Sequence, residues 1–144
     1  MKIVVQRSLN SKVSVATKNV GSISKGLVLL VCLEKGDDSN SIDKAAKKIL
    51  ALRIFSDELG RMNKNVLDSK GEILAISQFT LSWNGKKGNR PSFDNSMDPD
   101  SADKLFNKFC EILRRDVIVE TGSFGESMEV SIVNDGPVTF VLEF

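Results

Sequence analysis

Seven apolar residues follow one another without interruption in Leu27–Leu33, and this run constrains the fold more than any other part of the chain. A strand with one buried face alternates with period two, so a run that is apolar on both faces predicts a central strand covered on both sides. The run is too short to span a bilayer, which takes about 20 residues. It therefore predicts the middle of a buried sheet.

Segments near both ends of the chain alternate apolar and polar residues, which is typical of half-buried strands. We expect 2–9 and 11–17 to form a β-hairpin around the turn Asn10-Ser11, followed by a short strand at 22–24. The remaining expected strands are 72–81, 117–120, 128–133 and 138–144. Between the last two strands, the sequence Asn-Asp-Gly-Pro of residues 134–137 predicts a turn.

Two segments have the 3.6-residue period of amphipathic helices. The first begins near Ser41, and either Ser39 or Ser41 is expected to cap its N-terminus. Its apolar face comprises Ile42, Ala45, Ala46, Ile49 and Leu50. The second begins at Asp98-Pro99, an N-cap followed by proline at the first helical position. Its apolar face comprises Ala102, Leu105, Phe106, Phe109, Cys110 and Leu113.

The expected elements follow in the order three strands, helix, strand, helix, three strands, which predicts an α+β fold. Two helices are too few to cover both faces of so many strands. We therefore expect two packed β-sheets, or a flattened barrel, with both helices on one outer face. The length of the chain and the absence of repeats and linkers predict a single domain over residues 1–144.

The chain contains no histidine, and this zero limits the chemistry that it can perform. It excludes a Ser-His-Asp triad, a Cys-His pair and any histidine-ligated metal site. Cys32 and Cys110 fall on apolar faces, where a thiol behaves as a small buried hydrophobe rather than a nucleophile. We expect neither a metal site nor a cofactor.

The composition is that of a water-soluble globular protein, with 41% hydrophobic and 27% charged residues and a net charge of +1. The first residues do not form the core of a signal peptide, because Gln6 and Arg7 interrupt the apolar stretch. We therefore expect a cytoplasmic protein that does not associate with membranes. A net charge near zero argues against a general nucleic-acid coat but allows a local basic patch.

Three segments carry polar residues where chemistry is feasible. Ser77-Gln78-Phe79-Thr80 ends an apolar strand, where polar side chains emerge at the edge of a sheet. The Gly136-Pro137 bond lies in the predicted turn, and bonds to proline can adopt the cis form. The loop 83–93 carries Lys86, Lys87 and Arg90 between aromatic residues, a composition suited to contacts with phosphates. On these patterns alone, the segments are better explained as a strand end, a hairpin turn and a solvated loop.

The combination of motifs resembles the D-aminoacyl-tRNA deacylase family. The resemblance rests on four motifs at 77–81, 90–93, 121–124 and 134–140, together with Gln6-Arg7 and the segment 53–57. It covers essentially the whole chain. It implies an enzyme that hydrolyses the ester between a D-amino acid, or glycine mischarged on tRNA-Ala, and the terminal adenosine of tRNA.

The resemblance also implies a fold and an assembly. Members of the family form homodimers with two sheets and the helices on one side. Their Gly-Pro peptide is cis and reaches into the active site of the partner subunit. By this match, carbonyl oxygens of Gly136 and Pro137 bind the amino group of the substrate, and a close wall rejects L side chains sterically.

The residues of the first motif are the catalytic candidates: Ser77, Gln78, Phe79 and Thr80. A threonine nucleophile needs an adjacent base, and no histidine can supply one. We therefore expect the 2′-hydroxyl of the tRNA to assist the attack of water, while backbone N–H groups near Phe79 and Thr80 hold the oxyanion. Thr80 then orients the substrate.

Weaker correspondences concern the surroundings of the site. By the resemblance, Arg7 holds the Gly-Pro loop in place, and Phe124 and Met128 pack on the terminal adenine. Ser127 stands where the family pattern has alanine, which affects only the detailed shape of this pocket. Two alternatives remain: a non-catalytic tRNA-binding module, and a related deacylase with a trans Gly-Pro bond that accepts small L-amino acids.

Overall fold

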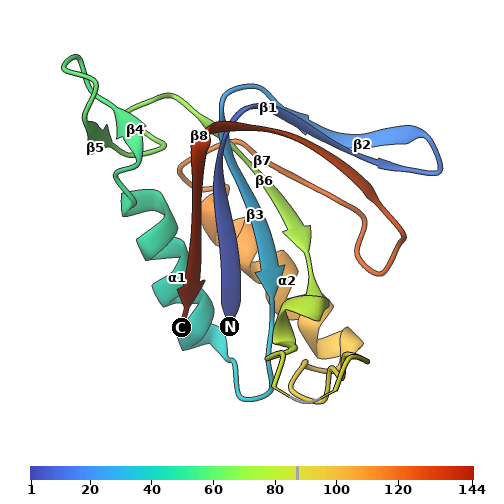
Figure 1. Ribbon diagram of the computed structural model, residues 1–144. Coiled ribbons are helices and arrows are strands. Elements are labelled where there is room, and N and C mark those ends of the chain that lie inside the picture. The colour runs from blue at the N-terminus through green and yellow to red at the C-terminus, as the bar shows by residue number, and fades with distance from the viewer. Residues whose placement is uncertain (87) are drawn as a thin grey trace.

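The computed structural model describes residues 1–86 and 88–144, and Figure 1 shows its arrangement. The strands are β1 (Lys2–Val15), β2 (Lys18–Ile23), β3 (Gly26–Cys32), β4 (Phe55–Ser56), β5 (Met62–Lys64), β6 (Glu72–Ser77), β7 (Val119–Thr121) and β8 (Glu129–Glu143). The helices are α1 (Ser39–Ala51), the short 3₁₀ helix η1 (Phe79–Ser82) and α2 (Pro99–Leu113).

The main sheet has six strands and curls upon itself. Its order is β2-β1-β3-β6-β7, and β8 pairs with β1 along most of the length of both strands. At Gly21 of β2, an added Cβ atom would lie only 2.6 Å from the carbonyl oxygen of Thr121 in β7, so the two ends of the sheet nearly meet. This confirms the α+β fold in its flattened-barrel form; β4 and β5 make a second, two-stranded sheet.

Strand β3 lies at the centre of the main sheet, as its uninterrupted apolar sequence predicts. It pairs antiparallel with β1 and parallel with β6. Leu27, Leu29 and Val31 face the helices, whereas Val28 faces the interior of the barrel. All four side chains are buried, which explains why no polar residue interrupts this segment.

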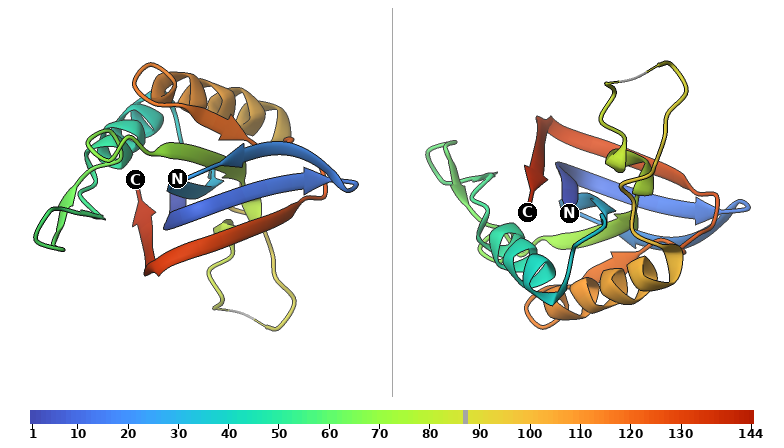
Figure 2. Two further views of the ribbon diagram at one scale, coloured as in Figure 1. Left: turned by 90° about the horizontal axis from the view of Figure 1, so that it is seen from above. Right: turned by 90° about the horizontal axis from the view of Figure 1, so that it is seen from below.

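Helices α1 and α2 both cover the same outer face of the sheet, as Figure 2 shows. Their apolar faces form one large core with strands β1, β3 and β6, and Phe109 of α2 is completely buried there. A smaller core fills the barrel on the other side of the sheet. Burying a side chain such as Phe109 contributes about 1.5–3 kcal/mol to folding, so the helices hold the curved sheet in place.

The N-terminus of α1 is capped by Asp38, and the prediction of Ser39 or Ser41 as the cap is wrong. The Asp38 carboxylate accepts hydrogen bonds from the N–H groups of Asn40 at 2.9 Å and Ser41 at 3.0 Å. These bonds, chiefly that from Ser41, lower the pKa of Asp38. The cap of α2 is Asp98 with Pro99 at the first position, as predicted.

Strand β1 is continuous, and the predicted turn at Asn10-Ser11 is wrong. The hydroxyls of Ser8 and Ser11 share a hydrogen bond of 2.7 Å inside the fold, and the pairing with β8 shifts between these two residues. The break in alternation at this point is therefore a bulge. The chain turns later, at Ala16 and Thr17, whose positive φ angles of 45° and 69° suit a two-residue hairpin loop.

Strand β8 is also continuous, so two final strands replace the three that were predicted. Gln6 of β1 pairs with Thr139, and Ser8 pairs with Asn134, which leaves residues 135–138 as a bulge in the middle of β8. The Asn-Asp-Gly-Pro sequence is therefore not a hairpin turn. The small β4–β5 sheet, which was not predicted, consists of strands of only two and three residues.

Candidate functional site

The first motif lies where β6 leaves the sheet. The expected strand 72–81 ends early, at Ser77. The N–H of Gln78 donates to the carbonyl of Val31 at 2.7 Å, and η1 then carries Phe79 and Thr80 to the surface. The Gln78 side-chain amide donates to the hydroxyl of Thr80. The four candidate residues of the motif thus lie together at the end of the sheet.

An apolar pocket of about 380 Å³ opens beside this motif. Ser77, Gln78 and Phe79 line it on one side, and residues of α2 and its preceding loop line the other. Phe79 packs edge to face on Phe93, with ring centroids 5.0 Å apart. A pocket with aromatic walls and a few polar groups at its rim suits a flat ring such as a nucleobase.

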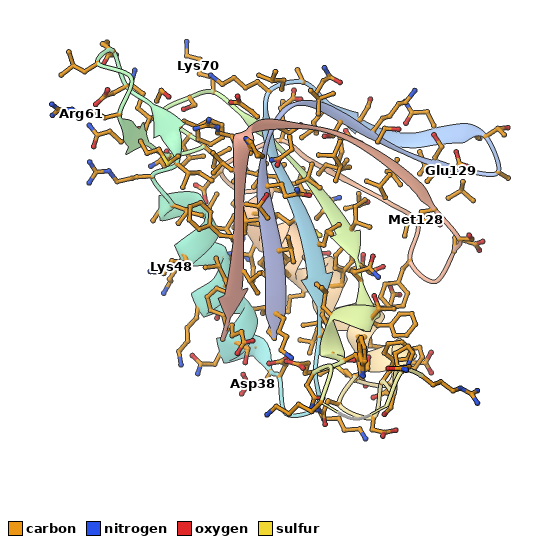
Figure 3. All side chains as sticks on the ribbon, in the orientation of Figure 1. Asp38, Lys48, Arg61, Lys70, Met128 and Glu129 are labelled. Carbon is orange, nitrogen blue, oxygen red and sulfur yellow. The ribbon has the colours of Figure 1, made fainter. Side chains whose placement is uncertain are left out.

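Phe124 and Met128 line two neighbouring pockets and not a single one. Phe124 packs against Phe106 at 6.2 Å in the apolar pocket. Met128 lines a second pocket, of about 240 Å³, that shares Ser77, Gln78 and Phe79 with the first. Figure 3 labels Met128 next to Glu129, the first residue of β8. Both side chains therefore adjoin the first motif, on its two sides.

The backbone of η1 offers hydrogen-bond donors at the motif. Phe79 and Thr80 are the first two residues of this short helix, and N–H groups at a helix start have no acceptor within the helix. Among the described residues, neither N–H has another acceptor. These two groups are available to a ligand.

Gly136 and Pro137 form the exposed tip of the bulge in β8, and the bond between them is cis. Arg7 links the bulge to the chain near Ile54. Its Nη1 donates to the carbonyl of Ile54 at 2.6 Å, and its Nε lies 2.8 Å from Oδ2 of Asp135 in an ion pair. Only 8% of Arg7 is exposed, so this charge is held inside the fold beside the Gly-Pro segment.

Asn134 and Thr139, which were not among the predicted site residues, close the base of the same bulge. The Asn134 amide donates to the carbonyls of Arg7 at 2.9 Å and Val138 at 3.0 Å, and its oxygen accepts from the Thr139 hydroxyl. The sequence does show an amide and a hydroxyl on the two sides of the Gly-Pro pair. Their hydrogen bonds require a continuous β8, however, and the predicted turn at 134–137 excluded a continuous strand.

The two principal motifs do not meet within one chain. Ser8, next to Arg7, pairs with Gly26 at one end of β3, whereas Ser77 pairs with Val31 at the other end. Gly26 and Val31 are five residues apart in β3, which corresponds to about 16 Å along the strand. In Figure 1, the bend of β8 and the end of β6 accordingly lie at opposite ends of the sheet.

The basic loop is only partly described. Lys86 and Arg90 are exposed, and Lys87 lies outside the described residues. Within the described ranges 1–86 and 88–144, no group of three or more Cys, Asp or Glu side chains is arranged to hold a metal ion. No helix in this part of the chain is long and apolar enough to cross a membrane.

The two thiols are expected to be unreactive in the folded protein. Burial raises the pKa of Cys32 to about 11 and that of Cys110 to about 12, so neither forms the reactive thiolate near neutral pH. A thiol reagent at pH 8 should label neither cysteine in the native protein and both in urea. Rapid labelling of either native cysteine would contradict the buried placement.

Comparison with known proteins identifies the family. The family model described as D-Tyr-tRNA(Tyr) deacylase matches residues 4–143. A protein of Persephonella marina named D-aminoacyl-tRNA deacylase is 52% identical, over 99% of this chain and 97% of its own length. One of Lactobacillus acidophilus with the same name is 49% identical, over 99% of both.

Two solved structures share the fold of this chain. The structure of the c-Myc DNA Unwinding Element Binding Protein matches with a TM-score of 0.96 and 39% identity, covering 100% of this chain and 99% of that one. That of a probable eukaryotic D-amino acid tRNA deacylase has the same fold, with a TM-score of 0.84, 17% identity, and 98% and 97% coverage. The chain belongs to the D-Tyr-tRNA(Tyr) deacylase family. It is an enzyme of the hydrolase class.

Proposed function

We propose that this chain, as one domain over residues 1–144, removes D-amino acids from tRNA in the cytoplasm and also clears glycine mischarged on tRNA-Ala. The observation that carries the proposal is the full-length match to D-aminoacyl-tRNA deacylases at about 50% identity. Hydrolysis of D-aminoacyl-tRNA follows from this relationship. The pockets beside the first motif suggest how the substrate lies.

The terminal adenosine of the tRNA fits the aromatic pockets beside Gln78. In this proposal Phe124 and Met128 contact the adenine, and the support is that Phe124 lines one of the two pockets and Met128 the other. The ester carbonyl then lies at η1, where the N–H groups of Phe79 and Thr80 are free to bind an oxyanion. Lys86, Lys87 and Arg90 are assigned to the phosphates of the approaching strand.

A second copy of the chain completes the site in this proposal. The Gly136-Pro137 tip is exposed and held by Arg7 and Asn134, and Ser8, which pairs at the base of the bulge, lies about 16 Å along the sheet from Ser77 of the same chain. In a homodimer it reaches the first motif of the partner, where its carbonyls hold the substrate amino group. An L side chain then collides with the wall, while a D side chain or a hydrogen points outward.

The chemical step requires no imidazole. Water attacks the ester carbonyl and gives up a proton, assisted by the 2′-hydroxyl of the terminal adenosine. The bond between the acyl carbon and the ribose oxygen then breaks, and the ribose oxygen takes up a proton. The N–H groups of η1 stabilise the negative charge on the carbonyl oxygen meanwhile. The protein thus contributes positioning and backbone donors, which is consistent with a chain that lacks histidine.

Thr80→Ala is expected to retain deacylation within about tenfold of the unchanged protein, since the hydroxyl orients and does not attack. The Thr80 hydroxyl contacts the Gln78 amide, and no basic side chain among the described residues is hydrogen-bonded to it. Single-turnover rates on D-Tyr-tRNA provide the measurement. Complete loss of hydrolysis, with folding and tRNA binding intact, would point to a threonine nucleophile instead.

The proposed function is tested by incubating the purified chain with D-Tyr-tRNA, L-Tyr-tRNA and Gly-tRNA-Ala and following the loss of ester. We expect hydrolysis of the first and third but not of the second, and no effect of a chelator. If none of the three substrates is hydrolysed, the alternative of a non-catalytic tRNA-binding module is favoured. Hydrolysis of L-Tyr-tRNA would exclude the proposed steric rejection of L side chains. Sedimentation of the same sample tests the homodimer.

A further inference from the structure

A polar pocket of about 470 Å³ lies beyond η1, next to the site described above. Ser82 and Trp83, which end η1, line one side of it, and Asp94 and Asn95 line another. The segment 92–96 borders both pockets, because Ser92, Asp94 and Asn95 line the loop pocket, whereas Phe93 and Ser96 line the apolar pocket. The two pockets are therefore neighbours along this segment.

Three side chains that line the loop pocket, those of Trp83, Asp94 and Lys86, suit a nucleobase and its phosphate. Trp83 is 39% exposed, which leaves part of its ring open for stacking, the interaction that single-stranded nucleic acids use most. The Asp94 carboxylate, which accepts a hydrogen bond from Ser92, is an acceptor for an exocyclic amino group and repels a phosphate. Lys86 at the rim is suited to the phosphate that follows the base.

We propose that the loop pocket binds the cytosine of the penultimate nucleotide of the tRNA 3′ end. This rests on the proposed function, because it requires the terminal adenosine in the neighbouring aromatic pockets. Every tRNA ends in CCA, so the nucleotide before that adenosine carries a cytosine. The N4 amino group of this base donates to Asp94, and its ring stacks on Trp83.

The test compares three esters of D-tyrosine, on adenosine, on the dinucleotide CpA and on UpA. For the unchanged protein we expect kcat/KM about tenfold higher for CpA than for adenosine or UpA. Trp83→Ala should lower the CpA value to that of adenosine and leave the adenosine ester within twofold, which also shows that the variant is folded. Asp94→Asn should remove the preference for CpA over UpA.

Asn89→Ala is the matched control, because Asn89 is exposed in the same loop and does not line the pocket; it should behave as the unchanged protein. Equal rates for the CpA and adenosine esters in the unchanged protein would overturn the proposal that the loop pocket binds cytosine. A Trp83→Ala variant that hydrolyses both esters more slowly by the same factor would also overturn it. Failure to hydrolyse D-Tyr-tRNA itself would overturn the proposed function.

Discussion

Gly136→Ala is expected to lower the single-turnover rate on D-Tyr-tRNA by at least about a hundredfold. Gly136 has a φ of +117°, and an added Cβ would lie 2.7 Å from Cγ2 and 3.1 Å from the backbone N of Val138. It would also lie 3.3 Å from Nη2 of Arg7, so the tip of the bulge must move. A shift of about 1 Å in a positioning group can cost about a hundredfold in rate.

Gly60→Ala provides the matched control for backbone strain. Gly60 also has a positive φ, of +76°, but an added Cβ there would meet nothing within 4 Å. The variant should lose about 1 kcal/mol of stability, as expected for a left-handed residue that is not glycine, and keep its deacylation rate. If Gly136→Ala retained full activity, the Gly-Pro tip would have no part in catalysis.

Arg7→Met is expected to have the second large effect, on both stability and stereochemical selection. Methionine fills a similar volume but leaves the Ile54 carbonyl without its donor and Asp135 without its partner. Because Arg7 is buried, we expect a loss of about 2–4 kcal/mol in the free energy of unfolding, measured in urea. Deacylation of D-Tyr-tRNA should fall, and any residual activity should discriminate less between D and L substrates.

Arg53→Met is the control for removing an arginine that donates to a backbone carbonyl. The Nε of Arg53 donates to the carbonyl of Asn63 at 2.7 Å, but this residue is exposed. Its loss should cost less than about 1 kcal/mol and leave activity unchanged. Equal destabilisation by the two variants would mean that burial of Arg7 beside the bulge has no special role.

The site could be predicted from the sequence in part. The placement of Ser77–Thr80 at a strand end follows from the change from apolar to polar residues, and the structure has these residues there. The roles of Arg7 and Gly136-Pro137 came from the resemblance to a family and not from their pattern. Asn134 was missed, because its hydrogen bonds to Arg7 and Val138 exist only when β1 and β8 lie side by side.

The sequence by itself determined the central strand β3 and the helices α1 and α2, together with the faces that they bury. The apolar run of β3, the stripe of α2 and the Asp98-Pro99 cap are local patterns, and side-chain periodicity encodes burial directly. It also excluded imidazole chemistry, since no histidine is present.

Only the tertiary structure decided how the strands continue. Asn10-Ser11 and Asn134–Pro137 read locally as turns, but pairing between β1 and β8 carries both strands through as bulges. The same pairing sets the Gly-Pro tip and the Ser77–Thr80 motif at opposite ends of β3. The physical reason is that turn residues specify a local bend, whereas hydrogen bonds to a distant strand decide whether the chain reverses or continues.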